Sequence, residues 1–490
     1  MGICRRDFGK CVVGGLTGAL LGATLRPKLL VIVVLEQFRP DYLDMVRPQL
    51  VSGGFRRLQE KGAVFNNCLH LASTFSSSAI ATLATGAWPA QHGIVADHWY
   101  DRAAKRAISP SEEELQATTL AAQVAAEPRT RVTVVSLNRS HATLFAGTPD
   151  ARLFWLDELG HFATNGEAPD WLTTFNGQRT PETVHNMRWL ALGARPDAPP
   201  LRTLTYSEEH PQEFQALYRG SPFAQLAEFD LLNELIVRDN MGKGEHFDVV
   251  CLIAGAMGHL GYETGSRSPL MQQLTMHLDR RIEALLAVLA KTPGDGAFNL
   301  ALTGAHGAPP APAAESRERM AVHGEQVAQA IDRALAASGS GRVDKYVYPF
   351  LYLNTEGFRD PEPLREAAAR AALRHPAVAG FYTAGGFCSV HDDWERRFRN
   401  SFHPTRSGDV MLSYRPEYVE SFGQGRGVSY GSLYNYDARV PLCLYGPQFR
   451  GGQFEQTIET VDFAPTLARA LGVALPSSST GRVLGEALAE

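Results

Sequence analysis

Two patterns of apolar and polar positions follow each other repeatedly along the chain. Continuous apolar runs rich in β-branched residues predict strands that are buried on both faces, as in a parallel sheet. They occupy residues 29–35, 132–137, 249–253, 298–303 and 440–445. Helical patterns occur at residues 77–85, 115–126, 271–291, 325–337 and 463–471. This alternation predicts an α/β fold, with a doubly wound, mostly parallel sheet flanked by helices.

Two stretches interrupt the alternation. Residues from about 150 to 222 are rich in aromatic residues, Pro and Asn, and residues from about 340 to 435 contain only short strand patterns. We expect both to be insertions that cap the sheet. Elaborated α/β folds reach this length as one unit, so residues 28–490 are predicted to form a single domain.

The first 27 residues have a different character. Arg5, Arg6 and Phe8 precede an apolar, glycine-rich stretch at residues 11–23. A charged segment before a short apolar one is typical of a secretory signal, and the paired arginines resemble the twin-arginine export motif. We therefore expect an exported, periplasmic protein. No small-residue cleavage site is evident, so an uncut N-terminal segment associated with the membrane is one alternative, and a cytosolic chain is another.

The net charge and the cysteines argue against a nucleic-acid partner and against a disulfide or zinc–thiolate site. The formal net charge of -5 gives no reason to expect a basic surface, so a nucleic-acid partner is not expected. The six cysteines form no C-x-x-C pair, and several lie in apolar runs. Buried free thiols are therefore favoured over a disulfide or a zinc–thiolate site.

Polar residues follow the predicted strands, where ligands bind in sheets of this kind. In chain order the segments read EQFRPDY (36–42), STFSSSAIATLATG (73–86), PAQHGI (89–94), WYD (99–101), GH (258–259), TGAHG (303–307), HP (403–404), SGD (407–409), YGSLYNYD (430–437) and TVDFAPTL (460–467). In this order and spacing they resemble the alkaline phosphatase superfamily. The branch they resemble most is that of the bacterial phosphomonoesterases, which is related to nucleotide pyrophosphatases and type I phosphodiesterases.

The resemblance implies a site with two zinc ions that hold the phosphate and activate a Thr or Ser nucleophile. It places Ser76 at the nucleophile position at the start of a helix. The alternative is that Ser76 or Ser77 only caps that helix. Remnant metal ligands would be Glu36, in place of an Asp, and the two histidines His259 and His306.

Three further ligand positions of the family are lost. Gly255 and Ala305 stand where the family has Asp, and Tyr430 stands where it has His. A protein zinc site needs three or four ligands, and neither Gly nor Ala offers a side-chain ligand atom. The resemblance therefore implies a dismantled centre, with no cofactor expected and zinc as the metal if any is retained.

The phosphate-contacting positions are altered too. Asp97 stands where the family has Asn, and Asn138 and Ser140 stand where this branch has Lys and Arg. Arg139 would point to the other face if the segment were extended. Positive charge is thus lost and negative charge gained where a phosphate would lie. His98 and His141 are candidate replacement ligands, although a histidine near a strand end is more often structural.

Two functions follow from the resemblance. The first is an exported pseudoenzyme, which keeps the scaffold and binds an unknown ligand or protein partner; an envelope scaffold would share this sequence evidence. The alternative is a remodelled hydrolase of phosphate esters that uses Ser76 as its nucleophile. Either way, we expect Glu36, Ser76, His259, His306 and Tyr430 to converge on one cleft.

Overall fold

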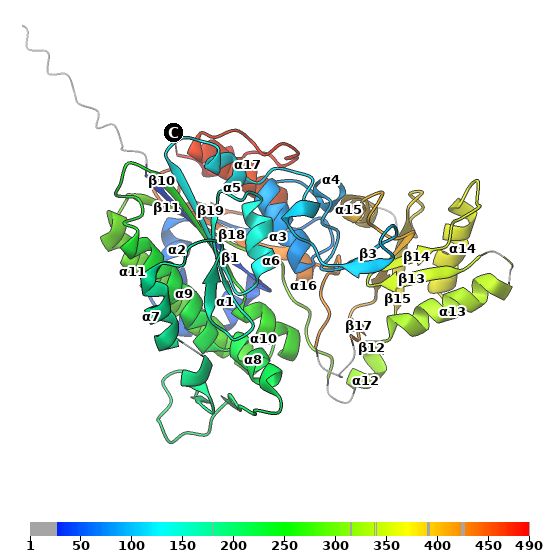
Figure 1. Cartoon of the computed structure of the whole chain (residues 1–490), viewed down its shortest axis with the longest axis horizontal. Coiled ribbons are helices and arrows are strands. Elements are labelled where there is room, and N and C mark those ends of the chain that lie inside the picture. Colours follow the sequence, from blue (N-terminus) through cyan, green and yellow to red (C-terminus); the bar gives the residue numbers. More distant parts are fainter. Residues whose placement is uncertain are drawn as a thin grey trace, which may run out of the picture.

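The computed structural model describes residues 27–179, 181–313, 316–337, 339, 341–389, 393–422 and 427–489. Figure 1 shows a large sheet with helices on either side, and a smaller sheet that lies beside it. The export motif predicted within residues 1–27 lies outside the described residues, apart from Pro27. None of the described helices combines the length and apolarity needed to cross a lipid bilayer.

The main sheet has ten strands, in the order β19-β2-β18-β11-β1-β10-β5-β6-β7, with β20 paired to β2. Five neighbours, from β11 to β6, run parallel, whereas β18 runs antiparallel between β11 and β2. The strands are β1 (Leu29–Leu35), β2 (Ala63–Leu69), β5 (Thr130–Ser136), β6 (Arg152–Leu156), β7 (Phe162–Thr164), β10 (Phe247–Ala254), β11 (Phe298–Gly304), β18 (Arg439–Tyr445), β19 (Gly452–Phe454) and β20 (Ile458–Glu459).

The predicted strands are all present. Two features of the sheet differ from the prediction: the direction of one strand and the number of strands at one end. The run at residues 440–445 forms β18, which is antiparallel to its neighbours, because an apolar run reports burial but not direction. The segment expected to be inserted from about residue 150 begins with β6 and β7, which extend the main sheet. These strands are short and begin or end with polar residues, so they lack the long apolar run that marks the central strands.

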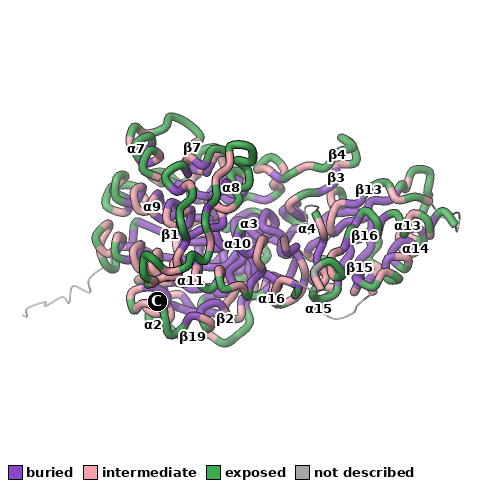
Figure 2. Tube along the Cα trace, turned by 90° about the horizontal axis from the view of Figure 1, so that it is seen from below, coloured by how far each residue is buried: buried purple, intermediate pink, exposed green. Residues whose placement is uncertain are grey.

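Alternate side chains of β1 pack into two separate cores, one on each face of the sheet. Leu30, Ile32 and Val34 pack toward one set of helices, and Leu29 and Val31 toward the other. The first set is α3 (Ser76–Thr85), α5 (Leu120–Ala125), α6 (Arg139–Ala146) and α17 (Phe463–Leu471). The second is α1 (Asp41–Met45), α2 (Phe55–Lys61), α7 (Asp170–Arg179), α8 (Pro211–Arg219), α9 (Pro222–Arg238), α10 (Ala256–Thr264) and α11 (Pro269–Leu289). The doubly wound α/β arrangement is therefore confirmed, and Figure 2 shows its buried interior.

One predicted helix is shorter than expected. The pattern at residues 115–126 forms α5, which begins only at Leu120. The hydroxyl of Thr119 accepts a hydrogen bond from the Ala122 N–H at 2.9 Å. This side-chain cap at Thr119 sets the start of the helix, and the polar residues before it lie outside.

The smaller sheet is a separate antiparallel unit. Its strand order is β13-β14-β16-β15, and α13 (Gly324–Ala337) and α14 (Glu362–Ala372) share its core. The strands are β13 (Val343–Val347), β14 (Phe350–Leu353), β15 (Val378–Thr383) and β16 (Val410–Tyr414). The insertion expected at about residues 340–435 thus begins earlier, because α13 packs on this sheet and not on the main one.

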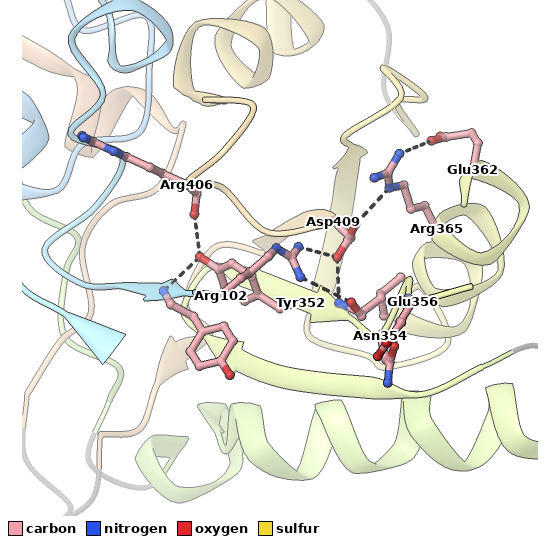
Figure 3. A network of polar contacts seen from close by, with 10 residues as sticks. Arg102, Tyr352, Asn354, Glu356, Glu362, Arg365, Arg406 and Asp409 are labelled. Carbon is pink, nitrogen blue, oxygen red and sulfur yellow. Dashed lines mark hydrogen bonds and ion pairs between the residues drawn. The ribbon is translucent and has the colours of Figure 1, made fainter. Parts of the chain in front are cut away.

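A buried carboxylate joins the smaller sheet to the rest of the molecule (Figure 3). Asp409 is 2% exposed and lies just before β16. Its Oδ2 accepts hydrogen bonds from Arg102 at 2.6 Å and from the Leu353 N–H at 2.7 Å, and its Oδ1 accepts one from Arg365 at 3.0 Å. Arg102 follows β3 (Trp99–Asp101), so this network ties the small sheet to a hairpin of the main body.

A second buried carboxyl group makes the smaller unit sensitive to pH. Glu420, in the short strand β17 (Val419–Glu420), accepts hydrogen bonds from the hydroxyls of Tyr346 at 3.0 Å and Tyr414 at 2.8 Å. Burial raises the pKa of Glu420 to about 7. A carboxyl group whose pKa is raised by folding stabilises the folded state fully at pH values below its unfolded pKa. This stabilisation is lost as the pH rises through the folded-state pKa.

We therefore expect Glu420→Gln to flatten the pH dependence of stability. Between about pH 5 and about pH 8, the variant should lose roughly 2 kcal/mol less unfolding free energy than the wild type, because Gln does not ionise. Urea denaturation at both pH values measures this difference. Glu417→Gln, at an exposed position nearby, should leave the wild-type slope unchanged. Equal slopes in the wild type and Glu420→Gln would contradict the expectation.

Candidate functional site

The parallel register brings the ends of three central strands to one edge of the sheet. The last residue of β1 pairs with the last residue of β10 and with the last residue of β11. Glu36, Gly255 and Ala305 each follow one of these strands directly. The three positions therefore lie side by side, at the edge where α/β sheets bind ligands.

A cavity of about 360 Å³ opens at this edge. The expected convergence is confirmed, because Glu36, Ser76, His259 and Tyr430 all line the cavity and His306 contacts two of them. The lining residues are Glu36, Gln37, Ser76, Ser77, Asp97, His98, Ser109, Pro110, Leu137, Asn138, Ser140, His141, Gly258, His259, Tyr262 and Tyr430. We refer to this cavity as the cleft.

Ser76 and His306 form a hydrogen-bonded pair. Nδ1 of His306 lies 2.7 Å from the Gly307 carbonyl oxygen, which can only accept, so Nδ1 carries the proton. Nε2 therefore accepts from the Ser76 hydroxyl, 2.9 Å away. Burial lowers the pKa of His306, which keeps its ring neutral. Neither Ser76 nor Ser77 caps α3, because the N-cap residue is Phe75 and it makes no side-chain cap, so the capping alternative is wrong.

Glu36 and His141 form a buried ion pair. Nδ1 of His141, on α6, lies 2.8 Å from Oε1 of Glu36. Burial by itself disfavours the charge on both groups. The attraction between them nevertheless prevails, lowering the pKa of Glu36 and raising that of His141. The candidate replacement ligand His141 is thus the partner of the remnant ligand Glu36.

The carboxylate of Asp97 lies beside the first turn of α3. Its Oδ1 accepts a hydrogen bond from the Ser77 N–H at 2.8 Å, and its Oδ2 accepts one from the Tyr430 hydroxyl at 3.0 Å. The Tyr430 ring in turn stacks on His306, with centroids 4.8 Å apart. A helix N-terminus favours an anion, and here a carboxylate of the protein itself takes that place.

The positions expected to contact phosphate do not present positive charge. Asn138 is the N-cap of α6, and its Oδ1 accepts from the N–H and the hydroxyl of Ser140, both at 3.0 Å. The segment that starts at Asn138 therefore begins the helix α6 and is not an extended strand. The condition under which Arg139 was expected to point to the opposite face thus does not hold. The guanidinium of Arg139 lies over the Trp155 ring at 4.9 Å, and Arg139 lines an adjoining hollow instead of the cleft.

The residues present do not fit a two-zinc centre. Among the described residues, no group of three or more His, Cys, Asp or Glu side chains is placed to hold a metal ion. His306 is engaged at both ring nitrogens, and Glu36 is paired with His141. His98 is exposed, with Nδ1 3.0 Å from the Ser109 hydroxyl, and His259 is exposed on the cleft wall.

The cysteines agree with the prediction of buried free thiols as far as the structure describes them. Of the four cysteines in the described ranges, Cys68, Cys251 and Cys443 are buried free thiols, and Cys388 is buried. Cys4 and Cys11 lie outside those ranges. Burial raises the pKa of Cys443 to about 12, so its thiol stays protonated and is a poor metal ligand.

Sequence reasoning missed two polar residues at the site. Gln37 directly follows Glu36 and has a positive φ of 51°, which is uncommon for a residue other than glycine. Glu228 is fully buried on α9, where its Oε1 accepts from the Gly255 N–H at 2.7 Å, and burial raises its pKa. The only sequence signal for Glu228 is that it is a charged residue at a position of α9 where the helical pattern predicts an apolar one.

Comparisons with known proteins agree with this fold. The family model for type I phosphodiesterase / nucleotide pyrophosphatase matches residues 30–421. The chain is 23% identical to alkaline phosphatase PafA of Elizabethkingia meningoseptica over 98% of both chains, and 27% identical to alkaline phosphatase PhoD of Zymomonas mobilis over 91% of this chain and 86% of that one. The crystal structure of PafA matches with a TM-score of 0.83 at 21% identity, covering 95% of this chain and 99% of PafA. A structure of murine ectonucleotide pyrophosphatase / phosphodiesterase 5 matches with a TM-score of 0.56 at 14% identity, covering 91% of this chain and 95% of that one. The chain therefore belongs to the type I phosphodiesterase / nucleotide pyrophosphatase family, within the alkaline phosphatase superfamily.

Proposed function

We propose that this protein is an exported pseudoenzyme that keeps the phosphatase scaffold and uses the cleft to bind a ligand or partner. The observation that carries the proposal is the state of the former ligand positions. Gly255 and Ala305 provide no ligand atom, and the Tyr430 hydroxyl donates to Asp97. Zinc needs at least three protein ligands in such sites, whereas Glu36 is paired with His141 and His306 with Ser76, which leaves His259.

The charge of the cleft supports the same proposal. Asp97 holds the N-terminus of α3 and the Tyr430 hydroxyl, two donors beside Ser76 that would otherwise suit an anion. No Lys or Arg is among the residues that line the cleft in the described part of the chain. A phosphate dianion entering the cleft would therefore meet the Asp97 carboxylate, while the imidazolium of His141 is already paired with Glu36. Export is supported by the twin-arginine-like sequence of residues 5–23 alone.

One observation favours the second candidate, a remodelled hydrolase. The Ser76 hydroxyl donates to a neutral imidazole of His306, which is the arrangement of a nucleophile and its general base. In this candidate Ser76 attacks an ester without the help of two zinc ions. The stabilisation that such ions give to the developing charge, worth several kcal/mol, would have to come from elsewhere.

Zinc content and ester hydrolysis of the full-length protein, purified from cells grown with zinc, test the proposal. We expect well under one zinc per chain by elemental analysis. Hydrolysis of p-nitrophenyl phosphate and of bis-p-nitrophenyl phosphate should not exceed that of the Ser76→Ala variant. Tightly held zinc together with activity that Ser76→Ala abolishes would overturn the pseudoenzyme. Activity without zinc that both Ser76→Ala and His306→Gln abolish would establish the remodelled hydrolase instead.

A further inference from the structure

The cleft is a site built from hydrogen-bond acceptors and aromatic rings. Its lining includes two carboxylates, those of Glu36 and Asp97, and no Lys or Arg among the described residues. Glu36 is balanced by His141 at 2.8 Å, but Asp97 is held only by the neutral Ser77 N–H and Tyr430 hydroxyl. The net charge that faces the cavity is therefore negative, which is the reverse of what a phosphate site requires.

Two arginines lie beside the cleft without lining it. Arg139 and Arg219 line an adjoining hollow of about 430 Å³, which shares Leu137, Asn138 and His259 with the cleft. Arg139 lies over the Trp155 ring. Arg219 donates to the carbonyl oxygens of Leu137 and Asp157, both at 2.8 Å. Neither guanidinium group is therefore among the groups that line the cleft.

Two tyrosine rings form a corner of the cleft. Tyr262 and Tyr430 have ring centroids 6.4 Å apart and an interplanar angle of 81°. The face of an aromatic ring carries partial negative charge and attracts a cation that loses its water. The rings therefore add to the attraction that the Asp97 carboxylate exerts on a positively charged group.

An unsatisfied acceptor lies in the same wall. Oε1 of Gln37 is buried without a hydrogen-bond partner, and the residue as a whole is 2% exposed. The positive φ of Gln37 is a strained conformation, of the kind that often occurs at functional sites. This oxygen lies against Gly261, and a buried acceptor without a partner is unfavourable, so a rotation of the Gln37 side chain toward a ligand N–H would relieve the cost.

We propose that the cleft binds a small organic cation with a primary ammonium group. Asp97 accepts two hydrogen bonds from the protein, and a carboxylate has about four acceptor sites, so two remain for the ammonium. Tyr262 and Tyr430 flank the charge, and the Gln37 amide accepts a further N–H after a rotation of its side chain. This inference rests on the proposed binding function and names the chemical class of its ligand.

Isothermal titration calorimetry of the full-length protein tests it with three probes of defined charge. The probes are n-hexylammonium, its neutral analogue n-hexanol, and inorganic phosphate. We expect n-hexylammonium to bind about tenfold or more tightly than n-hexanol, because hydrogen bonds between charged groups are stronger than those of a neutral hydroxyl, and we expect no heat from phosphate. Asp97→Asn removes the charge and keeps one acceptor oxygen for the Ser77 N–H, while its NH2 group can donate to the Tyr430 oxygen, and it should weaken n-hexylammonium about tenfold.

Controls separate this inference from the proposed function. Asp150→Asn removes an exposed carboxylate beyond the other end of α6 and should leave the affinity unchanged. If Asp97→Asn does not fold, Tyr262→Leu provides the second variant and should also weaken binding. No binding of n-hexylammonium, equal binding of n-hexanol, binding of phosphate, or full affinity in both cleft variants would overturn the cation site. None of these results bears on zinc content or ester hydrolysis, which decide whether the protein is a pseudoenzyme.

Discussion

Zinc binding is expected to return when four side chains are restored together: Glu36→Asp, Gly255→Asp, Ala305→Asp and Tyr430→His. The register of β1, β10 and β11 already places the first three positions at one edge, and His259 and His306 are retained beside them. The four substitutions supply three carboxylates and one imidazole to these histidines. Elemental analysis should then give one to two zinc ions per chain, against well under one for the wild type, since each ion needs about three protein ligands.

The local backbone accepts the key substitution. Gly255 has φ -93° and ψ -16°, which any L-residue can adopt, and it is the N-cap of α10, where Asp is a preferred residue. A Cβ at this position would lie 3.4 Å from the Leu137 side chain, an ordinary contact. The tyrosine-to-histidine change also frees Asp97 from the Tyr430 hydroxyl.

The restored variant should depend on its metal for stability. Ala305 is fully buried and Gly255 lies against the buried Glu228, so carboxylates placed at these two positions, on either side of position 36, carry a large desolvation and repulsion cost without a cation. We therefore expect the melting temperature to fall below that of the wild type in a chelator and to recover when zinc is added. The matched control omits Ala305→Asp and should bind at most one zinc. A fully folded four-residue variant that takes up no zinc would show that the scaffold itself, and not only these side chains, has lost the centre.

Asp409→Ala is expected to cost about 3–5 kcal/mol of unfolding free energy, because removing one member of a buried ionic network leaves its partners uncompensated. In Figure 3 the carboxylate lies between Arg102 and Arg365, and it also accepts the Leu353 N–H. Its loss would leave two guanidinium groups and a strand N–H without this partner. Chemical denaturation followed by tyrosine and tryptophan fluorescence measures the change.

A control for this prediction lies in the same sheet. Asp344 is exposed on β13, and Asp344→Ala should change the unfolding free energy by no more than about 0.5 kcal/mol. Asp409→Asn should have an intermediate effect, because an amide oxygen still accepts hydrogen bonds but carries no charge. A loss in Asp409→Ala no larger than that in Asp344→Ala would mean that the network does not hold the small sheet to the main body.

Two kinds of information were readable from the sequence. The first is the sheet scaffold: the ranges predicted for β1 and α17 match the structure, because a continuous apolar run and a strong 3.6-residue period are properties of neighbouring residues. The second is the chemistry available at each position. Gly255 and Ala305 lack side-chain ligand atoms in any fold, and this could be read before their positions in space were known.

The tertiary structure decided how the remaining polar groups are used. Asp97 pairs with a tyrosine 333 positions away, Ser76 with a histidine 230 positions away, and Glu36 with a histidine 105 positions away. No local pattern encodes such pairs, because they depend on which side chains the packed elements bring within 3 Å. The same reason explains the antiparallel direction of β18 and the addition of β6 and β7 to the main sheet, since strand pairing is a contact between distant segments. The sequence thus determined the scaffold and the side-chain chemistry at each position, and only the packing decided which acceptors line the cleft.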